Sequence, residues 1–129
     1  MPKIDNFKRL EELTKELIDW GENVVEYEVE AGAGAARSKS LLNDPRVCVA
    51  NTMLEKGTIF PEHVHNAIEH VIVYTGEIKA EVDNETCFVK AGSAITIEKG
   101  KPHTVTALER TLMVAIVIPH DKGYPGNGQ

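Results

Sequence analysis

The chain has 129 residues, of which 42% are hydrophobic and 26% charged, a composition typical of one soluble globular domain with one core. Its net charge of −6 argues against nucleic acid as a partner, because nucleic acid binding requires a basic surface. No apolar run approaches the roughly 20 residues that span a bilayer, and the first residues lack the apolar core of a signal peptide. We therefore expect no membrane partner and a cytoplasmic location.

The first predicted element is a helix over residues 5–20. This stretch reads DNFKRLEELTKELIDW, and its large apolar residues recur at every third or fourth position: Phe7, Leu10, Leu13, Leu17 and Trp20. Asp5 can cap the start of the helix and Gly21 can end it. We predict an N-terminal α-helix within residues 1–21 that packs outside the domain or across a dimer interface, with a partner-binding helix as the alternative.

A strand and a loop are predicted next. Residues 22–30, ENVVEYEVE, alternate apolar and acidic side chains, which favours a strand with one wet face. Residues 31–46, AGAGAARSKSLLNDPR, begin with small, flexible residues and lack the phosphate-loop pattern. We expect a mobile loop here. The alternative is a lid or an anion-contacting arm that uses Arg37, Lys39 or Arg46.

The stretch 57–76, GTIFPEHVHNAIEHVIVYTG, concentrates residue types that bind metals. His63 and His65 are two apart, so in a strand they would point to the same face. A two-residue turn follows, and a hairpin would then return Glu69 to the two histidines. Two imidazoles and a carboxylate on neighbouring strands predict a metal site with open coordination positions. The alternative is an exposed polar hairpin that binds nothing.

A second stretch, GSAITIEKGKPHTVT, offers a fourth ligand. Its middle is strand-like, Gly100 marks a turn, and His103 follows as strand character resumes. A separate hairpin would then deliver His103 to the same ion. Standing alone, a histidine after such a turn would be solvated.

The remaining segments predict further short strands. Residues 47–54 lead into the first histidine stretch, and residues 77–90 form a hairpin through 83–85. The last strand, 111–118, is apolar on both faces, so we expect both faces to be covered. Residues 119–129 are predicted to fray, with His120 solvated rather than a ligand. Many short strands after one helix indicate an all-β, double-sheet barrel.

Alternation along the strands predicts which side chains accompany the ligands. If Glu69 and His103 face inward, so do the aliphatic residues two and four positions beyond them: Val71, Val73, Val105 and Ala107. The same alternation turns His70 outward, so it is not counted as a ligand. Cys48 and Cys87 have no cysteine nearby, and we expect buried free thiols.

These two stretches resemble the cupin motifs. The first cupin motif has Gly, five residues, His-x-His, three or four residues, Glu, six residues and Gly, and every spacing is matched by Gly57, His63, His65, Glu69 and Gly76. The second motif has Gly, five residues, Pro-x-Gly, two residues, His, three residues and Asn. Here Gly92, Gly100 and His103 match, while Glu98 replaces the Pro and Ala107 replaces the Asn.

The resemblance covers about residues 47–118, and it implies a double-stranded β-helix, or jelly-roll, cupin barrel. We place this barrel at residues 22–118, with its motifs at 57–76 and 92–107. The resemblance also implies a metal held by four residues: His63, His65, Glu69 and His103. It implies a homodimer, but no single reaction, because cupins host many.

Three imidazoles and one carboxylate suit a divalent transition metal, namely Mn, Fe, Ni, Co, Cu or Zn. Three functions compete. The first is a metal-dependent enzyme, either a dioxygenase-type oxidoreductase or an isomerase or lyase, acting on a small oxygen-rich molecule. The second is a non-catalytic module that binds or senses a small molecule. The third is a barrel used only for assembly, which the four intact ligands disfavour. Glu98 is a weak candidate for a general base, with solvation on a turn as the alternative.

Overall fold

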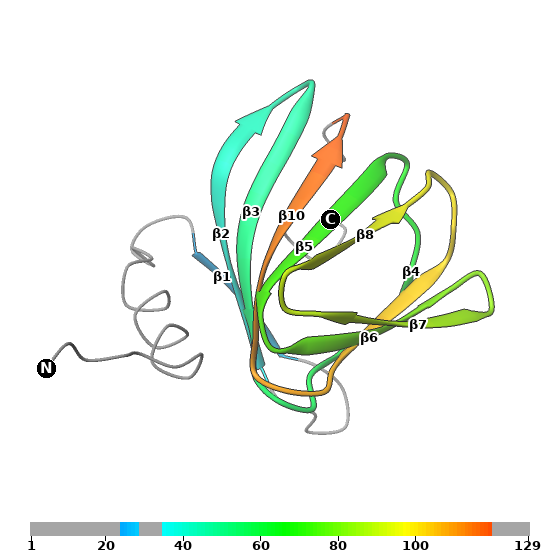
Figure 1. The fold of residues 1–129 in the computed structure, drawn as a ribbon. Helices are drawn as coiled ribbons and strands as arrows, with labels where there is room; N and C mark the ends of the chain where they lie inside the picture. The colour runs from blue at the N-terminus through cyan, green and yellow to red at the C-terminus, as the bar shows by residue number, and fades with distance from the viewer. Residues whose placement is uncertain (1–23, 29–34, 120–129) are drawn as a thin grey trace, which may run out of the picture.

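The computed structural model describes residues 24–28 and 35–119, which form two facing antiparallel sheets (Figure 1). One sheet has the order β1-β2-β3-β10-β5-β8 and the other the order β4-β9-β6-β7. The strands are β1 (Val24–Glu28), β2 (Ala35–Asp44), β3 (Val47–Leu54), β4 (Ile59–His63), β5 (Ile68–Thr75), β6 (Glu77–Val82), β7 (Glu85–Lys90), β8 (Ser93–Ile97), β9 (His103–Ala107) and β10 (Thr111–Ile118). The predicted all-β jelly roll is confirmed. The predicted helix and residues 120–129 of the predicted tail lie outside the described residues.

The chain changes sheet at every connection from β3 to β10 except the β6–β7 hairpin. The prediction that each histidine stretch forms a hairpin is therefore wrong. β4 pairs with β9, and β5 pairs with β10 and β8, so β4 and β5 lie in different sheets. β8 and β9 are separated in the same way. Turn residues and strand propensity locate the bend, but the pairing partners come from distant parts of the chain.

Glycines occupy four of these sheet-to-sheet connections. Their φ angles lie between +79° and +88°, a left-handed region that side chains with a Cβ rarely adopt: Gly57, Gly76, Gly92 and Gly100. All four belong to the two motifs. A chain that leaves one sheet and enters the facing sheet within a few residues must bend sharply, and glycine permits that bend.

The segment predicted as a mobile loop, 31–46, contains a regular strand. β2 spans Ala35–Asp44 and pairs with β1 and β3, so over these residues both the loop and the lid are wrong. Buried Ala36 and Ser38 alternate with the more exposed Arg37 and Lys39, which is the pattern of a half-buried strand. Ser38 also shares a buried hydroxyl hydrogen bond of 2.8 Å with a threonine of β3. Of the small residues that suggested flexibility, Ala36 lies on the inward side of this strand, and residues 31–34 lie outside the described residues.

The predicted β6–β7 hairpin is present, but its turn has two residues instead of the predicted three, because Glu85 already pairs with Val82. Asp83 and Asn84 connect the strands with φ angles of +50° and +69°. Positive φ at both central positions is the signature of a type I′ turn, whose twist matches that of paired strands.

The turn predicts the effects of two substitutions at Asn84. We expect Asn84→Gly to raise the free energy of unfolding by about 0.5 kcal/mol, because glycine adopts the left-handed conformation without a Cβ clash. Asn84→Val should lower it by about 1–2 kcal/mol, since a β-branched residue resists that conformation. Urea unfolding of both variants measures the difference. Equal stabilities would contradict the assigned turn.

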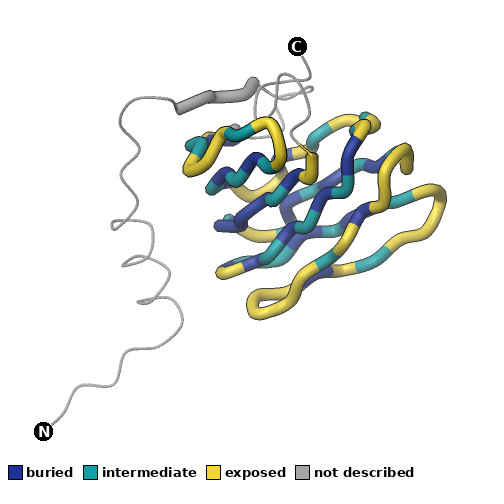
Figure 2. The backbone as a smooth tube through the Cα atoms, turned by 90° about the horizontal axis from the view of Figure 1, so that it is seen from above, coloured by how far each residue is buried: buried dark blue, intermediate teal, exposed yellow. Residues whose placement is uncertain are grey.

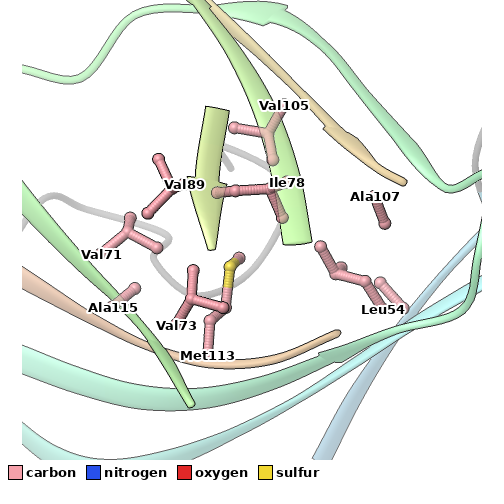
Figure 3. Packing of buried hydrophobic residues seen from close by; sticks show 10 residues of the cluster. Leu54, Val71, Val73, Ile78, Val89, Val105, Ala107, Met113 and Ala115 are labelled. Atoms are coloured by element: carbon pink, nitrogen blue, oxygen red, sulfur yellow. The ribbon is translucent and has the colours of Figure 1, made fainter. Parts of the chain in front are cut away.

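The core lies between the two sheets, and Figure 3 shows side chains from both converging there. Buried and exposed residues alternate along the strands, so the tube in Figure 2 changes colour from residue to residue. The core cluster is almost entirely aliphatic: Ala36, Leu54, Val71, Val73, Ile78, Val89, Val105, Ala107, Met113 and Ala115. Val71, Val73, Val105 and Ala107 thus face inward as the alternation predicted.

Three smaller predictions are also decided by the fold. β10 is buried over Thr111–Ala115 on both faces, as expected for a strand that is apolar throughout. Cys48 is a buried free thiol, whereas Cys87 is only partly buried, so the prediction is wrong for the second cysteine. Within the described ranges, the structure has no helix long and apolar enough to cross a membrane.

Candidate metal centre

The four predicted ligands come together from both sheets. His63 ends β4 and His103 begins β9, and the two residues pair directly in the four-stranded sheet. Glu69 lies on β5 in the facing sheet. His65 lies between β4 and β5, so the prediction that His63 and His65 share one strand is wrong. The four residues converge because the β4–β5 connection, which carries His65, passes from one sheet to the other beside His63 and Glu69.

The distances fit a single small site. The ligating atoms of His63, His65 and His103 all lie within 4.8 Å of one another. One carboxylate oxygen of Glu69, Oε1, lies 3.7 Å from Nε2 of His65 and 3.4 Å from Nε2 of His103. Two nitrogens that each bind one ion at about 2.0–2.1 Å lie at most about 4.2 Å apart, so the separations here approach those of ligands that share an ion. The fold therefore groups the three predicted histidines and places the Glu69 carboxylate beside two of them.

Two of the imidazoles have their ring orientation set by backbone carbonyl groups. Nδ1 of His63 donates to the carbonyl oxygen of Pro61 at 2.8 Å, and Nδ1 of His103 donates to that of Lys101 at 2.9 Å. A proton held on Nδ1 leaves the Nε2 lone pair directed into the site. Such outer hydrogen bonds fix both the tautomer and the orientation of metal-binding histidines.

His103 has a buried nitrogen that its surroundings leave unsatisfied. The residue is only 1% exposed, and its Nε2 finds no hydrogen-bond partner of good geometry among the described residues. The nearest acceptor is the Glu69 carboxylate at 3.4 Å. In the neutral ring that nitrogen is itself an acceptor, so two acceptors face each other. A cation between them, whether a proton or a metal ion, resolves this conflict.

The charges in the site favour the ligating forms of Glu69 and His63. Burial alone would raise the pKa of Glu69, but His103 and the other imidazoles outweigh it and lower that pKa. Burial lowers the pKa of His63, which keeps its ring neutral. For His103, burial acts to lower the pKa, but the Glu69 carboxylate and the Lys101 carbonyl together raise it. The imidazoles thus favour the ionised form of Glu69, and the carboxylate in turn favours positive charge beside it.

An irregularity in β4 shapes the site in a way that the sequence did not show. Phe60 pairs with Val105, and the next pair along the strands is His63 with His103. Over this interval β4 therefore has one residue more than β9. This bulge puts Phe60 and His63 on the same inward face although they are three residues apart. Strict alternation would have placed them on opposite faces, so no local signal identified Phe60.

The other residues considered from the sequence lie outside the site. His70 faces the outer side of its sheet, as predicted, and shares a 2.9 Å hydrogen bond with the hydroxyl of Thr96. Glu98 is exposed on the β8–β9 connection, which matches the solvated alternative. Ala107 is buried, and its backbone bonds to the Gly57–Thr58 turn through both its N–H and its carbonyl. Two backbone hydrogen bonds therefore tie Ala107 to this turn.

Comparison with known protein families identifies the family. The sequence pattern described as "Cupin domain" matches residues 51–119, which is more than half of the chain and includes all four predicted ligands. The chain belongs to the cupin family. No curated protein sequence matches this cupin significantly.

Solved structures show the same fold. A conserved protein of unknown function from Streptococcus pyogenes is 25% identical, with a TM-score of 0.63 over 66% of this cupin and 75% of that chain. KdgF from a Halomonas species is 20% identical, with a TM-score of 0.64 over 74% and 88%. An RmlC-like cupin from Shewanella frigidimarina is 17% identical, with a TM-score of 0.65 over 81% and 91%. At such identities the last two likenesses establish the fold alone.

Proposed function

We propose that this cupin binds one divalent transition metal through His63, His65, Glu69 and His103. The observation that carries the proposal is the buried Nε2 of His103, which faces the Glu69 carboxylate without a hydrogen-bond partner of good geometry among the described residues. Three nitrogens and one carboxylate oxygen suit Mn, Fe, Co, Ni, Cu or Zn. The two backbone carbonyl groups that hold the Nδ1 protons prepare His63 and His103 to bind through Nε2.

We further propose that the site is catalytic and acts on a small oxygen-rich metabolite. The bound metal would supply Lewis acidity, water activation or redox capacity. The chain's own contribution is a fixed set of ligands and an apolar surround. Glu69 stays ionised, His63 stays neutral, and the neighbouring Val71 and Val105 are buried aliphatic side chains. A dioxygenase-type oxidation and an isomerase or lyase reaction both fit this arrangement.

A second function, binding or sensing without turnover, is favoured by one observation. Apart from Cys48, the buried side chains of the described residues that can carry a charge are Glu69 and His103, both of them proposed ligands. No separate buried acid or base therefore stands ready for proton transfer within that part of the chain. The homodimer and the cytoplasmic location expected from the sequence stay predictions.

One series of experiments tests these proposals. Elemental analysis of protein purified without added metal should find about one transition-metal ion per chain, and Glu69→Gln should lose it. Oxygen uptake by the Fe(II)-loaded protein with diols or diketones would then support the dioxygenase-type function. Aldose–ketose or dehydration assays with Mn(II), Ni(II) or Zn(II) test the isomerase or lyase alternative. Tight binding of the same compounds without turnover would support the sensor, and full metal retention by Glu69→Gln would contradict the site.

A further inference from the structure

The strand register arranges the interior around the site in two successive rows. In the first row, His63 pairs with His103 on one sheet, and Glu69 pairs with Ile97 on the other. In the second row, Phe60 pairs with Val105, and Val71 pairs with Ile95. Successive rows on one face lie about 7 Å apart, because residues two positions apart along a strand share that face. The second row is therefore directly beside the proposed ligands.

Phe60 and Ile95 differ from the rest of the second row in their exposure. Their pairing partners Val105 and Val71 are 6% and 2% exposed, whereas Phe60 and Ile95 pack on the core cluster but stay partly exposed. Both lie on edge strands, β4 and β8. His63 and His65 are also partly exposed. Two of the proposed ligands and two residues of the second row are thus partly open to solvent.

All four side chains of the second row are apolar. A molecule that approaches the ligands past this row meets the partly exposed Phe60 and Ile95, whose pairing partners Val105 and Val71 are buried. Burying hydroxyl or carboxylate groups there without partners is costly. Burying a hydrocarbon group against the same side chains is favourable.

We infer that Phe60 and Ile95 select ligands in which two chelating oxygens are attached to an apolar body, rather than polyhydroxylated or doubly charged ligands. The inference rests on the proposed metal site, because the metal binds the oxygens. It adds that the second row selects the part of the ligand that does not bind the metal. Phe60 reaches this row only through the bulge in β4.

Two probes with the same chelating group test the inference. Acetohydroxamate and benzohydroxamate differ in the apolar body alone, and calorimetric titration of the Co(II)-loaded protein measures both affinities. Parallel titrations of aqueous Co(II) correct for intrinsic chelation, and gluconate serves as the polyhydroxylated probe. We expect benzohydroxamate to bind at least about tenfold more tightly than acetohydroxamate, and gluconate to bind weakly.

Three variants test whether Phe60 is responsible for this preference. Phe60→Ala should reduce the preference to less than about threefold, and Phe60→Leu should leave an intermediate value. Ile59→Ala is the matched control, because Ile59 is adjacent in sequence and pairs with Thr106 on the outer face. It should keep the full preference. Stoichiometric Co(II) uptake shows that each variant is folded.

The outcomes separate this inference from the proposed metal site. If Co(II) binds but the unaltered protein prefers neither hydroxamate, or prefers gluconate, the inference is overturned and the metal site stands. A preference that survives in both Phe60 variants also overturns it. If the unaltered protein takes up no Co(II), the metal site fails and the inference fails with it.

Discussion

We expect His63→Ala to lower the metal affinity by more than about 100-fold. Loss of an outer hydrogen-bond partner of a ligand already costs about 10- to 100-fold, and this substitution removes a ligand itself. The fold should survive, because His63 is partly exposed and ends its strand, so alanine leaves no enclosed cavity. Competition with a fluorescent chelator measures the affinity, and far-ultraviolet circular dichroism checks the fold.

His70, which follows the proposed ligand Glu69 in the sequence, provides a matched control. His70→Ala also removes an imidazole, but His70 bonds Thr96 on the outer side of its sheet. It should therefore bind metal like the unaltered protein. If both variants retain metal equally, or both lose it, the metal is not held by the proposed ligands.

The largest expected effect on stability comes from Gly76→Ala. Gly76 is the single residue between β5 and β6, where the chain leaves one sheet for the other with a φ of +87°. A Cβ there would lie 2.5 Å from Oγ1 of Thr111 and closer still to the carbonyl oxygen of Arg110. Thr111 is buried and its hydroxyl bonds Glu77, so it has little freedom to move away. We expect a loss of about 2–4 kcal/mol in the free energy of unfolding.

Gly92→Ala separates the two causes of that loss. Gly92 has nearly the same φ, +85°, but a Cβ there meets nothing within 4 Å. It should cost only the backbone strain, about 1–2 kcal/mol. Denaturant unfolding of the metal-free proteins gives both values. Equal losses would show that the contact with Thr111 and Arg110 is relieved at no cost.

Local sequence was sufficient for the identity of the candidate ligands and of the bends. His63, His65, Glu69 and His103 were recognisable from their spacing, and the fold brings all four together. The alternation that placed Val71 and Val105 inward also held. These features depend on residue type and on the period of a strand, both of which are written in a few consecutive residues.

The tertiary structure alone decided how those residues meet. Each motif crosses between sheets instead of forming a hairpin, residues 35–44 form a strand where a loop was predicted, and Phe60 turns inward. Each of these depends on which distant strand supplies the backbone hydrogen bonds. β4, for example, is bulged only with respect to β9, some forty residues further along the chain. Pairing between distant segments leaves no mark in local composition, so the sequence indicated the candidate ligands and the fold decided which strands bring them together.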